Sequence, residues 1–145
     1  MLDDDNDAEA QAGWREALAS HPDVPVRVLT PESTEDEIND AIEQARQYDV
    51  VVTPIFMAVR AWKNRVTLDP VLARIPGELR EAGAKVVAAS FTSPYVVRQF
   101  PDVEAYVCAY APHRLSQRAA VQALWGELPF PGRLPVDLAL LSPNA

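Results

Sequence analysis

The chain has 145 residues, of which 48% are hydrophobic and 23% are charged, values typical of one soluble globular domain long enough to bury a core. The formal net charge is −8, from 21 acidic and 13 basic residues, and no basic run occurs. This balance argues against nucleic acid as a partner, because phosphates require clustered Lys and Arg. No apolar run approaches the roughly 20 residues that a membrane helix needs, so we expect no membrane partner.

The first half of the chain predicts a helix, a strand, a second helix and a second strand. Residues 8–20 carry helix formers with an amphipathic spacing, and 24–29 (VPVRVL) is typical of a short strand. Thr34 and Glu37 form a capping-box pattern, which predicts the start of a helix. Residues 49–56 (DVVVTPIF) are mostly β-branched and apolar, as in a strand covered on both faces.

The second half continues the alternation. Pro70 predicts the start of a helix that Pro76-Gly77 must interrupt. Residues 85–91 (KVVAASF) predict another fully buried strand and 105–110 (AYVCAY) a fourth strand, with a short helix (YVVRQF) between them. The run LSQRAAVQALWG predicts a last helix, N-capped by Ser116 or just before it.

This order of elements predicts an α/β fold: a three-layer, doubly wound, mainly parallel sheet of the flavodoxin-like sandwich type. We treat residues 1–145 as a single domain. Such a domain ordinarily begins with a strand, whereas here only Met1 and Leu2 precede the acidic segment and first helix, so we expect the first strand to be lacking. Loss of a central strand leaves an unpaired sheet edge, which a homo-oligomer could close.

Candidate functional residues lie where strands end, because ligands of open α/β sheets bind at the carboxyl edge. Thr92, Ser93 and Tyr95 follow the strand at 85–91, and Trp62 lies in the long loop after 49–56. No glycine-rich phosphate loop and no GxSxG turn follows any predicted strand, so we expect no nucleotide cofactor. For Trp62, packing over the local core is the favoured interpretation.

The other reactive residue types do not indicate a catalytic or metal site. Cys108 is the only cysteine, so no internal disulfide forms and the usual Cys/His metal spacings are missing; we predict an inert buried thiol and no metal. His113 lies at the same predicted edge as Ser93, but nothing else of a catalytic triad is recognisable, and an exposed loop histidine is favoured. The run DDDND (3–7) is interpreted as a solvated acidic loop before a helix.

The residues from 90 onward resemble the C-terminal α/β sandwich domain of glycoside hydrolase family 3, closest to its bacterial β-N-acetylhexosaminidase-like members. The run DVVVTPIFMAVRAWKNRVTL is similar to an earlier strand and long loop of that domain, so the resemblance covers nearly the whole chain. The matching motifs stand in the family's order and spacing: Ser90-Phe91-x-x-Pro94-Tyr95, Phe100-Pro101-x-Val103, Ala109-Tyr110, Gln117 to Ala120, Ala123-Leu124-x-Gly126-Glu127 and Gly132-x-Leu134-Pro135-Val136.

The resemblance implies a non-catalytic accessory domain. In that family an N-terminal barrel holds the catalytic Asp, and in the hexosaminidase-like branch a barrel loop supplies the general acid/base; no such barrel is encoded in these residues. We therefore expect a barrel of a parent protein as partner, carbohydrate bound through that barrel, and no glycosidase activity in the chain alone. Trp62, Thr92, Ser93 and Tyr95 are the candidates for bordering the sugar cleft. The alternative is a free-standing flavodoxin-like binding or signalling module.

Overall fold

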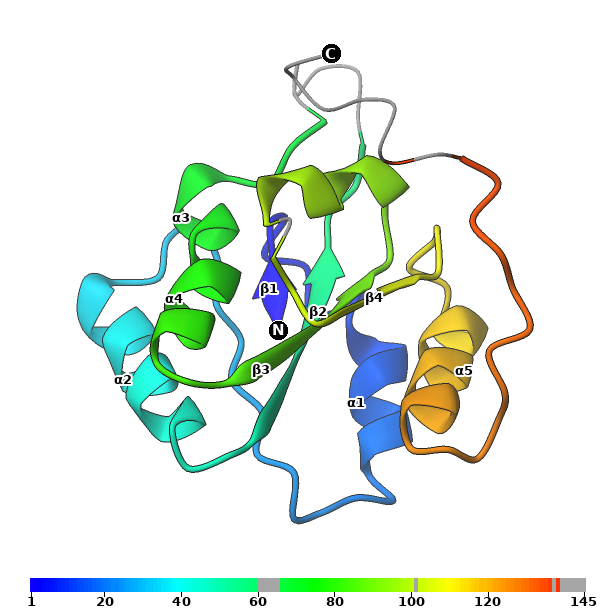
Figure 1. Ribbon diagram of the computed structural model, residues 1–145, viewed down its shortest axis with the longest axis horizontal. Helices are drawn as coiled ribbons and strands as arrows, with labels where there is room; N and C mark the ends of the chain where they lie inside the picture. Colours follow the sequence, from blue (N-terminus) through cyan, green and yellow to red (C-terminus); the bar gives the residue numbers. More distant parts are fainter. Residues whose placement is uncertain (60–65, 101, 137, 139–145) are drawn as a thin grey trace.

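The structure is a computed structural model, which describes residues 1–59, 66–100, 102–136 and 138. Helices flank a parallel sheet, as the alternating sequence pattern predicts (Figure 1). In chain order the elements are β1 (Leu2–Asp3), α1 (Ala12–Leu18), α2 (Glu35–Ala45), β2 (Val50–Phe56), α3 (Pro70–Ala73), α4 (Ile75–Glu81), β3 (Lys85–Ser90), the 3-10 helix η2 (Pro94–Gln99), β4 (Ala105–Cys108) and α5 (Arg114–Leu124).

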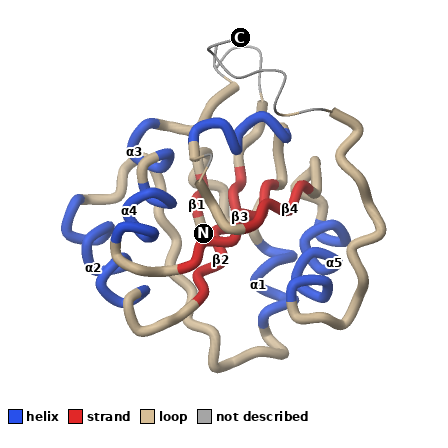
Figure 2. The backbone as a smooth tube through the Cα atoms, viewed as in Figure 1, coloured by secondary structure: helices blue, strands red, loops and turns tan. Residues whose placement is uncertain are grey.

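The four strands, red in Figure 2, lie in the order β1-β2-β3-β4. Every neighbouring pair is parallel. Leu2 lies opposite Ile55, and on its other side it forms a single bridge with Leu29. All four strands therefore end at one common edge of the sheet, and their amino ends lie at the other.

The sheet separates two apolar layers. On one face α2, α3 and α4 pack through Ile38, Leu72 and Ile75 against Ile55 and Val86 of the strands. The other face carries α1 and α5, on the opposite side of the sheet in Figure 1. This arrangement is the expected three-layer α/β sandwich.

The second layer is built around stacked aromatic rings. The Phe56 and Phe91 rings are nearly parallel with centroids 5.0 Å apart, and the Trp14 ring meets Phe91 edge-on at 5.7 Å. Gln117 of α5 is fully buried beside them, and its side-chain oxygen accepts a hydrogen bond of 2.6 Å from the Trp14 amide. The rings thus fix α1 and α5 against the end of β3.

Two predictions of helix boundaries are confirmed. The Thr34 hydroxyl accepts a hydrogen bond from the Glu37 amide, and the Glu37 carboxylate accepts one from the Thr34 amide, which is the predicted capping box at the start of α2. The helix predicted from Pro70 divides into α3 and α4 at Arg74, just before Pro76. The N-cap of α5 is His113, three residues before Ser116.

The strand predicted at 24–29 is wrong over most of its length, since Leu29 alone forms a bridge, to Leu2. A strand needs a partner along its length, and β1 provides only Leu2 and Asp3. The first strand, which was expected to be lacking, is present as the two-residue β1 and pairs with β2. None of the helices in the described part of the chain is long and apolar enough to span a bilayer.

Candidate functional site at the carboxyl edge of the sheet

The carboxyl edge of the sheet is formed by the residues that follow the four strands. Asp4 follows β1, Met57 follows β2, Phe91 follows β3 and Ala109 follows β4, while η2 lies across this end of the molecule (Figure 1). In open parallel sheets this edge is where ligands bind, so its side chains decide what the domain can do.

The first two residues of the acidic segment, Asp3 and Asp4, are buried rather than solvated, which corrects the sequence-based interpretation for them. The Asp3 side chain is fully buried and accepts hydrogen bonds from the amides of Asp5 (3.2 Å) and Asp7 (2.9 Å) and from the Gln11 side chain (2.7 Å). The turn from β1 into α1 leaves several backbone amides without helical partners, and this carboxylate satisfies them.

Asp4 and Asp5 connect this turn by hydrogen bonds to the segments that follow β2. An oxygen of Asp4 accepts a hydrogen bond of 2.7 Å from the Asp69 amide, and an oxygen of Asp5 accepts one of 2.6 Å from the Ala58 amide. Carboxylates that accept such bonds hold loops in place. No group of three His, Cys, Asp or Glu side chains within the described ranges is arranged to hold a metal ion.

The turn after β3 is a capped corner. The Thr92 amide donates to the Ser90 hydroxyl (3.3 Å), and the Ser93 hydroxyl accepts from the Tyr95 amide (3.4 Å), which caps η2. The Tyr106 hydroxyl donates to the Pro94 carbonyl at 3.2 Å, and burial raises the pKa of Tyr106. This phenol therefore stays protonated at neutral pH and acts as a donor that holds the corner.

The candidate border residues differ in accessibility. Thr92 is buried, Ser93 is half-buried, and Tyr95 has 38% of its surface exposed, with the Arg98 guanidinium 4.8 Å from its ring centroid. Trp62 lies outside the described residues. Tyr95, with Arg98 against its ring, is therefore the most exposed of the three described candidates.

The hypothetical Ser93–His113 pair does not form. Each side chain caps its own helix: Ser93 caps η2, and the His113 Nδ1 accepts a hydrogen bond of 3.2 Å from the Leu115 amide at the start of α5. Cys108 is half-buried and not buried as predicted, and its partial burial raises the pKa of the thiol, which stays protonated at neutral pH.

Sequence reasoning missed Tyr110, which lies just beyond β4. This residue has a φ of 63°, a left-handed conformation uncommon for a residue with a bulky side chain, and 47% of its surface is exposed. Its place directly before Ala-Pro at a predicted strand end was the available signal. Tyr95 and Tyr110 thus give the edge two exposed phenol rings.

The comparisons with known proteins support the fold. No protein-family model matches the chain, and no curated protein matches it. Among solved structures, it is similar to a fungal multi-domain GH3 β-N-acetylglucosaminidase in which a unique GCN5-related glucosamine N-acetyltransferase region is described. The TM-score is 0.70 at 18% sequence identity, over 90% of this chain and 14% of the other. The chain thus shares its fold with a part of a much longer enzyme.

Proposed function

We propose that the chain is a non-catalytic accessory domain of a family 3 glycoside hydrolase, of the β-N-acetylglucosaminidase or β-hexosaminidase-like kind. Its role is to pack against a catalytic barrel and to border the sugar cleft of that barrel. The observation that carries the proposal is the fold likeness to a GH3 β-N-acetylglucosaminidase over 90% of the chain. The ordered family-like motifs from Ser90 to Val136 point in the same direction.

The non-catalytic assignment rests on how the carboxylates at the edge are used. A retaining glycosidase needs two carboxyl groups roughly 5 Å apart, both free to face the glycosidic bond. Asp3, Asp4 and Asp5 instead accept hydrogen bonds from backbone amides of nearby loops. Their oxygens hold structure, which supports assigning the chemistry to another domain.

The bordering role is assigned to the exposed side chains of the carboxyl edge. A phenol ring presents an apolar face and one polar hydroxyl, which suits contact with a sugar ring. Tyr95 offers such a face at the corner after β3, and Ser93 lies beside it. We expect Tyr95 to contribute binding and no chemistry.

The first test is an activity assay on the isolated chain with a chromogenic N-acetylglucosaminide. We expect no turnover above the buffer rate, and an Asp5→Asn variant serves as the matched control for any signal. Turnover that co-purifies with the chain and disappears in Asp5→Asn would overturn the non-catalytic assignment. The natural coding region is the second test, since a barrel encoded upstream is expected, and its absence would favour the free-standing module.

The bordering role is tested in the polypeptide that carries both domains. Tyr95→Ala should raise KM about 10-fold or less with kcat nearly unchanged, as expected when a substrate contact outside the reacting centre is lost. Tyr48→Ala is the control, because Tyr48 is also an exposed tyrosine but lies just before β2, away from the carboxyl edge. Unchanged KM in Tyr95→Ala would remove this residue from the cleft border.

A further inference from the structure

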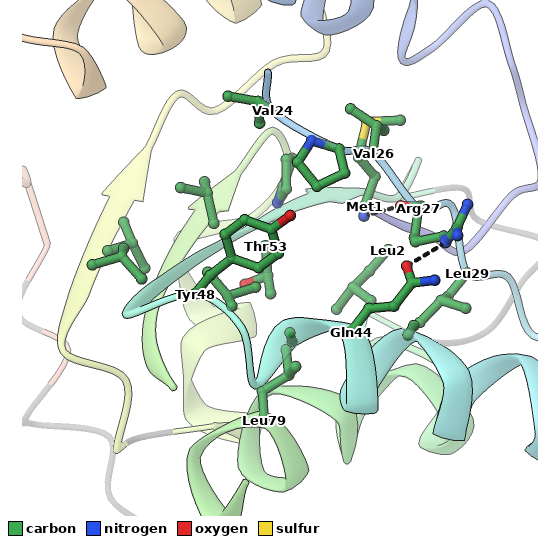
Figure 3. A pocket seen from close by; sticks show the side chains of 18 of the residues that line it. Met1, Leu2, Val24, Val26, Arg27, Leu29, Gln44, Tyr48, Thr53 and Leu79 are labelled. Atoms are coloured by element: carbon green, nitrogen blue, oxygen red, sulfur yellow. Dashed lines mark hydrogen bonds between the residues drawn. The ribbon is translucent and has the colours of Figure 1, made fainter. Parts of the chain in front are cut away.

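A cavity of about 530 Å³ opens between β2 and residues 24–28, away from the carboxyl edge (Figure 3). Its walls come from both helix layers: Ile42 and Leu79 lie on one side of the sheet, and Trp14 and Trp125 lie on the other. A cavity within one layer would touch only one of these pairs. The space therefore passes through the plane of the sheet, and we call it the strand slot.

The β2 side of the slot is an unpaired strand edge. The carbonyls of Asp49 and Ile55 accept hydrogen bonds from Lys85 and Phe91 on the β3 side, whereas the Phe56 carbonyl accepts one from Asp4 on the β1 side. Because the direction alternates along a strand, Val50 and Val52 turn their amides and carbonyls toward the slot. Among the described residues, neither makes a backbone hydrogen bond there.

The opposite side of the slot, formed by the segment that ends at Leu29, also presents backbone groups for pairing with a strand. Leu29 exchanges hydrogen bonds with Met1 and Asp3, and the Arg27 carbonyl accepts one of 2.6 Å from the Met1 nitrogen. At the level of Leu2, one strand thus fills the space between Leu29 and Ile55. Beyond Met1 the two walls continue without a strand between them (Figure 3).

The slot would bury side chains on both sides of the sheet. Leu2 belongs to the core of the α2–α4 layer, whereas Met1 packs against the core of the α1–α5 layer. Large apolar side chains at the slot are exposed, Val24 at 37%, Tyr48 at 44% and Val50 at 52%. An occupant must therefore be apolar at successive positions.

We propose that the strand slot is completed by an extended apolar segment joined to the amino end of β1, which adds to the sheet in parallel register opposite Val50–Thr53. Continuity with the β1–β2 pairing fixes its direction, and the Met1 nitrogen already points along the register that a peptide amide would take. This inference rests on the proposed function, in which a longer polypeptide precedes the domain.

Grafted strands test the slot without any barrel, so their failure would leave the activity test of the proposed function untouched. A Val-Ile-Val-Val extension is fused before Met1, and a Gly-Ser-Gly-Ser extension of equal length is the control. We expect the apolar graft to raise Tm by at least about 5 °C and the control to leave it unchanged. Amide hydrogen exchange at Val52 should slow at least 10-fold in the apolar graft alone, because a strand bond then protects it.

Single lysines in the graft distinguish a central strand from an edge strand. The graft position next to Met1 faces the α2–α4 layer, as Leu2 does, and the position before it faces the α1–α5 layer, as Met1 does. Lysine at either position should abolish the Tm gain. Retention of the gain with lysine at one of these positions, or no added protection of Val52, would overturn the proposal.

The source of the strand is tested by separating the graft from the chain. The same tetrapeptide added in trans at equal concentration should give no Tm shift, because it lacks the effective concentration that the covalent link supplies. An equal shift in trans would contradict continuity with β1. A dimer that forms equally with and without the apolar graft, with no gain in Tm from the graft, would assign the slot to a second copy and would likewise overturn the proposal.

Discussion

Gln117 shows how one side chain can hold several segments together. Its carbonyl oxygen accepts from the Trp14 amide, and its amide group donates to the carbonyls of Ala10 (2.8 Å) and Pro112 (2.9 Å). The side chain is fully buried, so removing it leaves three backbone groups without partners. An unsatisfied buried polar group typically costs about 1–3 kcal/mol.

We therefore expect Gln117→Ala to lower the free energy of unfolding by about 2–4 kcal/mol, measured by urea denaturation. Arg118→Ala on the exposed side of the same helix is the control and should change it by less than about 0.5 kcal/mol. Equal stability of the two variants would show that water replaces the lost contacts.

The amino group of Met1 should make stability depend on pH. Burial, followed by the nearby charge of Arg15, lowers the pKa of this group from 8.0 to about 5. Between these values the unfolded chain binds more protons than the folded chain, so stability rises with pH from about 5 to 8. Relative to pH 8, the free energy of unfolding therefore decreases as the pH falls toward 5, where the folded chain must protonate this amine.

Thermal unfolding followed between pH 5 and pH 8 measures this effect. The N-terminally acetylated chain is the control, because acetylation removes the titrating group and leaves an amide in its place. We expect the Tm of the free chain to rise more steeply with pH than that of the acetylated chain. Identical slopes would mean that the Met1 amine is solvated in the folded protein.

At the scale of elements, α1 and α5 approach each other closely at Gly13. A Cβ at this position would lie 2.7 Å from the Arg114 Cα and 3.0 Å from its carbonyl oxygen, which are backbone atoms that cannot move aside alone. Gly77 in α4 has no heavy atom within 4 Å of the corresponding point. The same substitution should therefore have opposite effects at these two helical positions.

We expect Gly13→Ala to lower the free energy of unfolding by about 1–3 kcal/mol, because overpacking forces the helices apart. Gly77→Ala should raise it by about 0.5–1 kcal/mol through helix propensity. Urea denaturation of both variants checks the pair. A Gly13→Ala protein as stable as the unsubstituted chain would contradict the close approach of the helices.

Local sequence signals predicted the elements well where the cause of the structure is itself local. Thr34 and Glu37 define the start of α2 through bonds between neighbouring residues, and Pro76 divides α3 from α4 through its own ring. The strand at 24–29 was predicted wrongly because pairing depends on a distant segment, and β1 contacts only Leu29 there.

The candidate site was predictable in place but not in detail. Strand ends located the edge around Thr92–Tyr95, yet the burial of Asp3 depends on where the amides of Asp5 and Asp7 lie after folding. Acidic composition alone favours a solvated loop. Which polar groups are exposed is decided by the turn geometry, and no residue pattern encodes that directly.

At the scale of the whole molecule, acidic charge is in excess. The net charge is −8, and the ion pairs that span elements, such as Arg74 with Glu35 and Arg114 with Glu9, join exposed side chains that salt can also screen. Exposed pairs contribute little, whereas net self-repulsion opposes compactness. Added salt should therefore stabilise the folded chain on balance.

We expect Tm at pH 7.5 to rise by a few degrees between about 50 mM and 500 mM NaCl, because the Debye length falls from roughly 14 Å to 4 Å. The control is the same series near the isoelectric point, about 4.7, where little net charge remains to be screened and the rise should vanish. A fall of Tm with salt at pH 7.5 would mean that the ion pairs outweigh the repulsion.

The anchoring of β1 has a mechanical consequence. The Asp3 and Asp4 amides donate to the carbonyls of Leu29 and Phe56, and the Leu29 amide donates to the Met1 carbonyl, so this short strand is held from both sides. A tension applied along the strand from its amino end would load these bonds together in shear instead of opening them one by one. The Asp3 carboxylate resists the same displacement, since it ties the strand to the turn that follows. The first residues of the domain are therefore suited to resist tension applied from the amino end of β1.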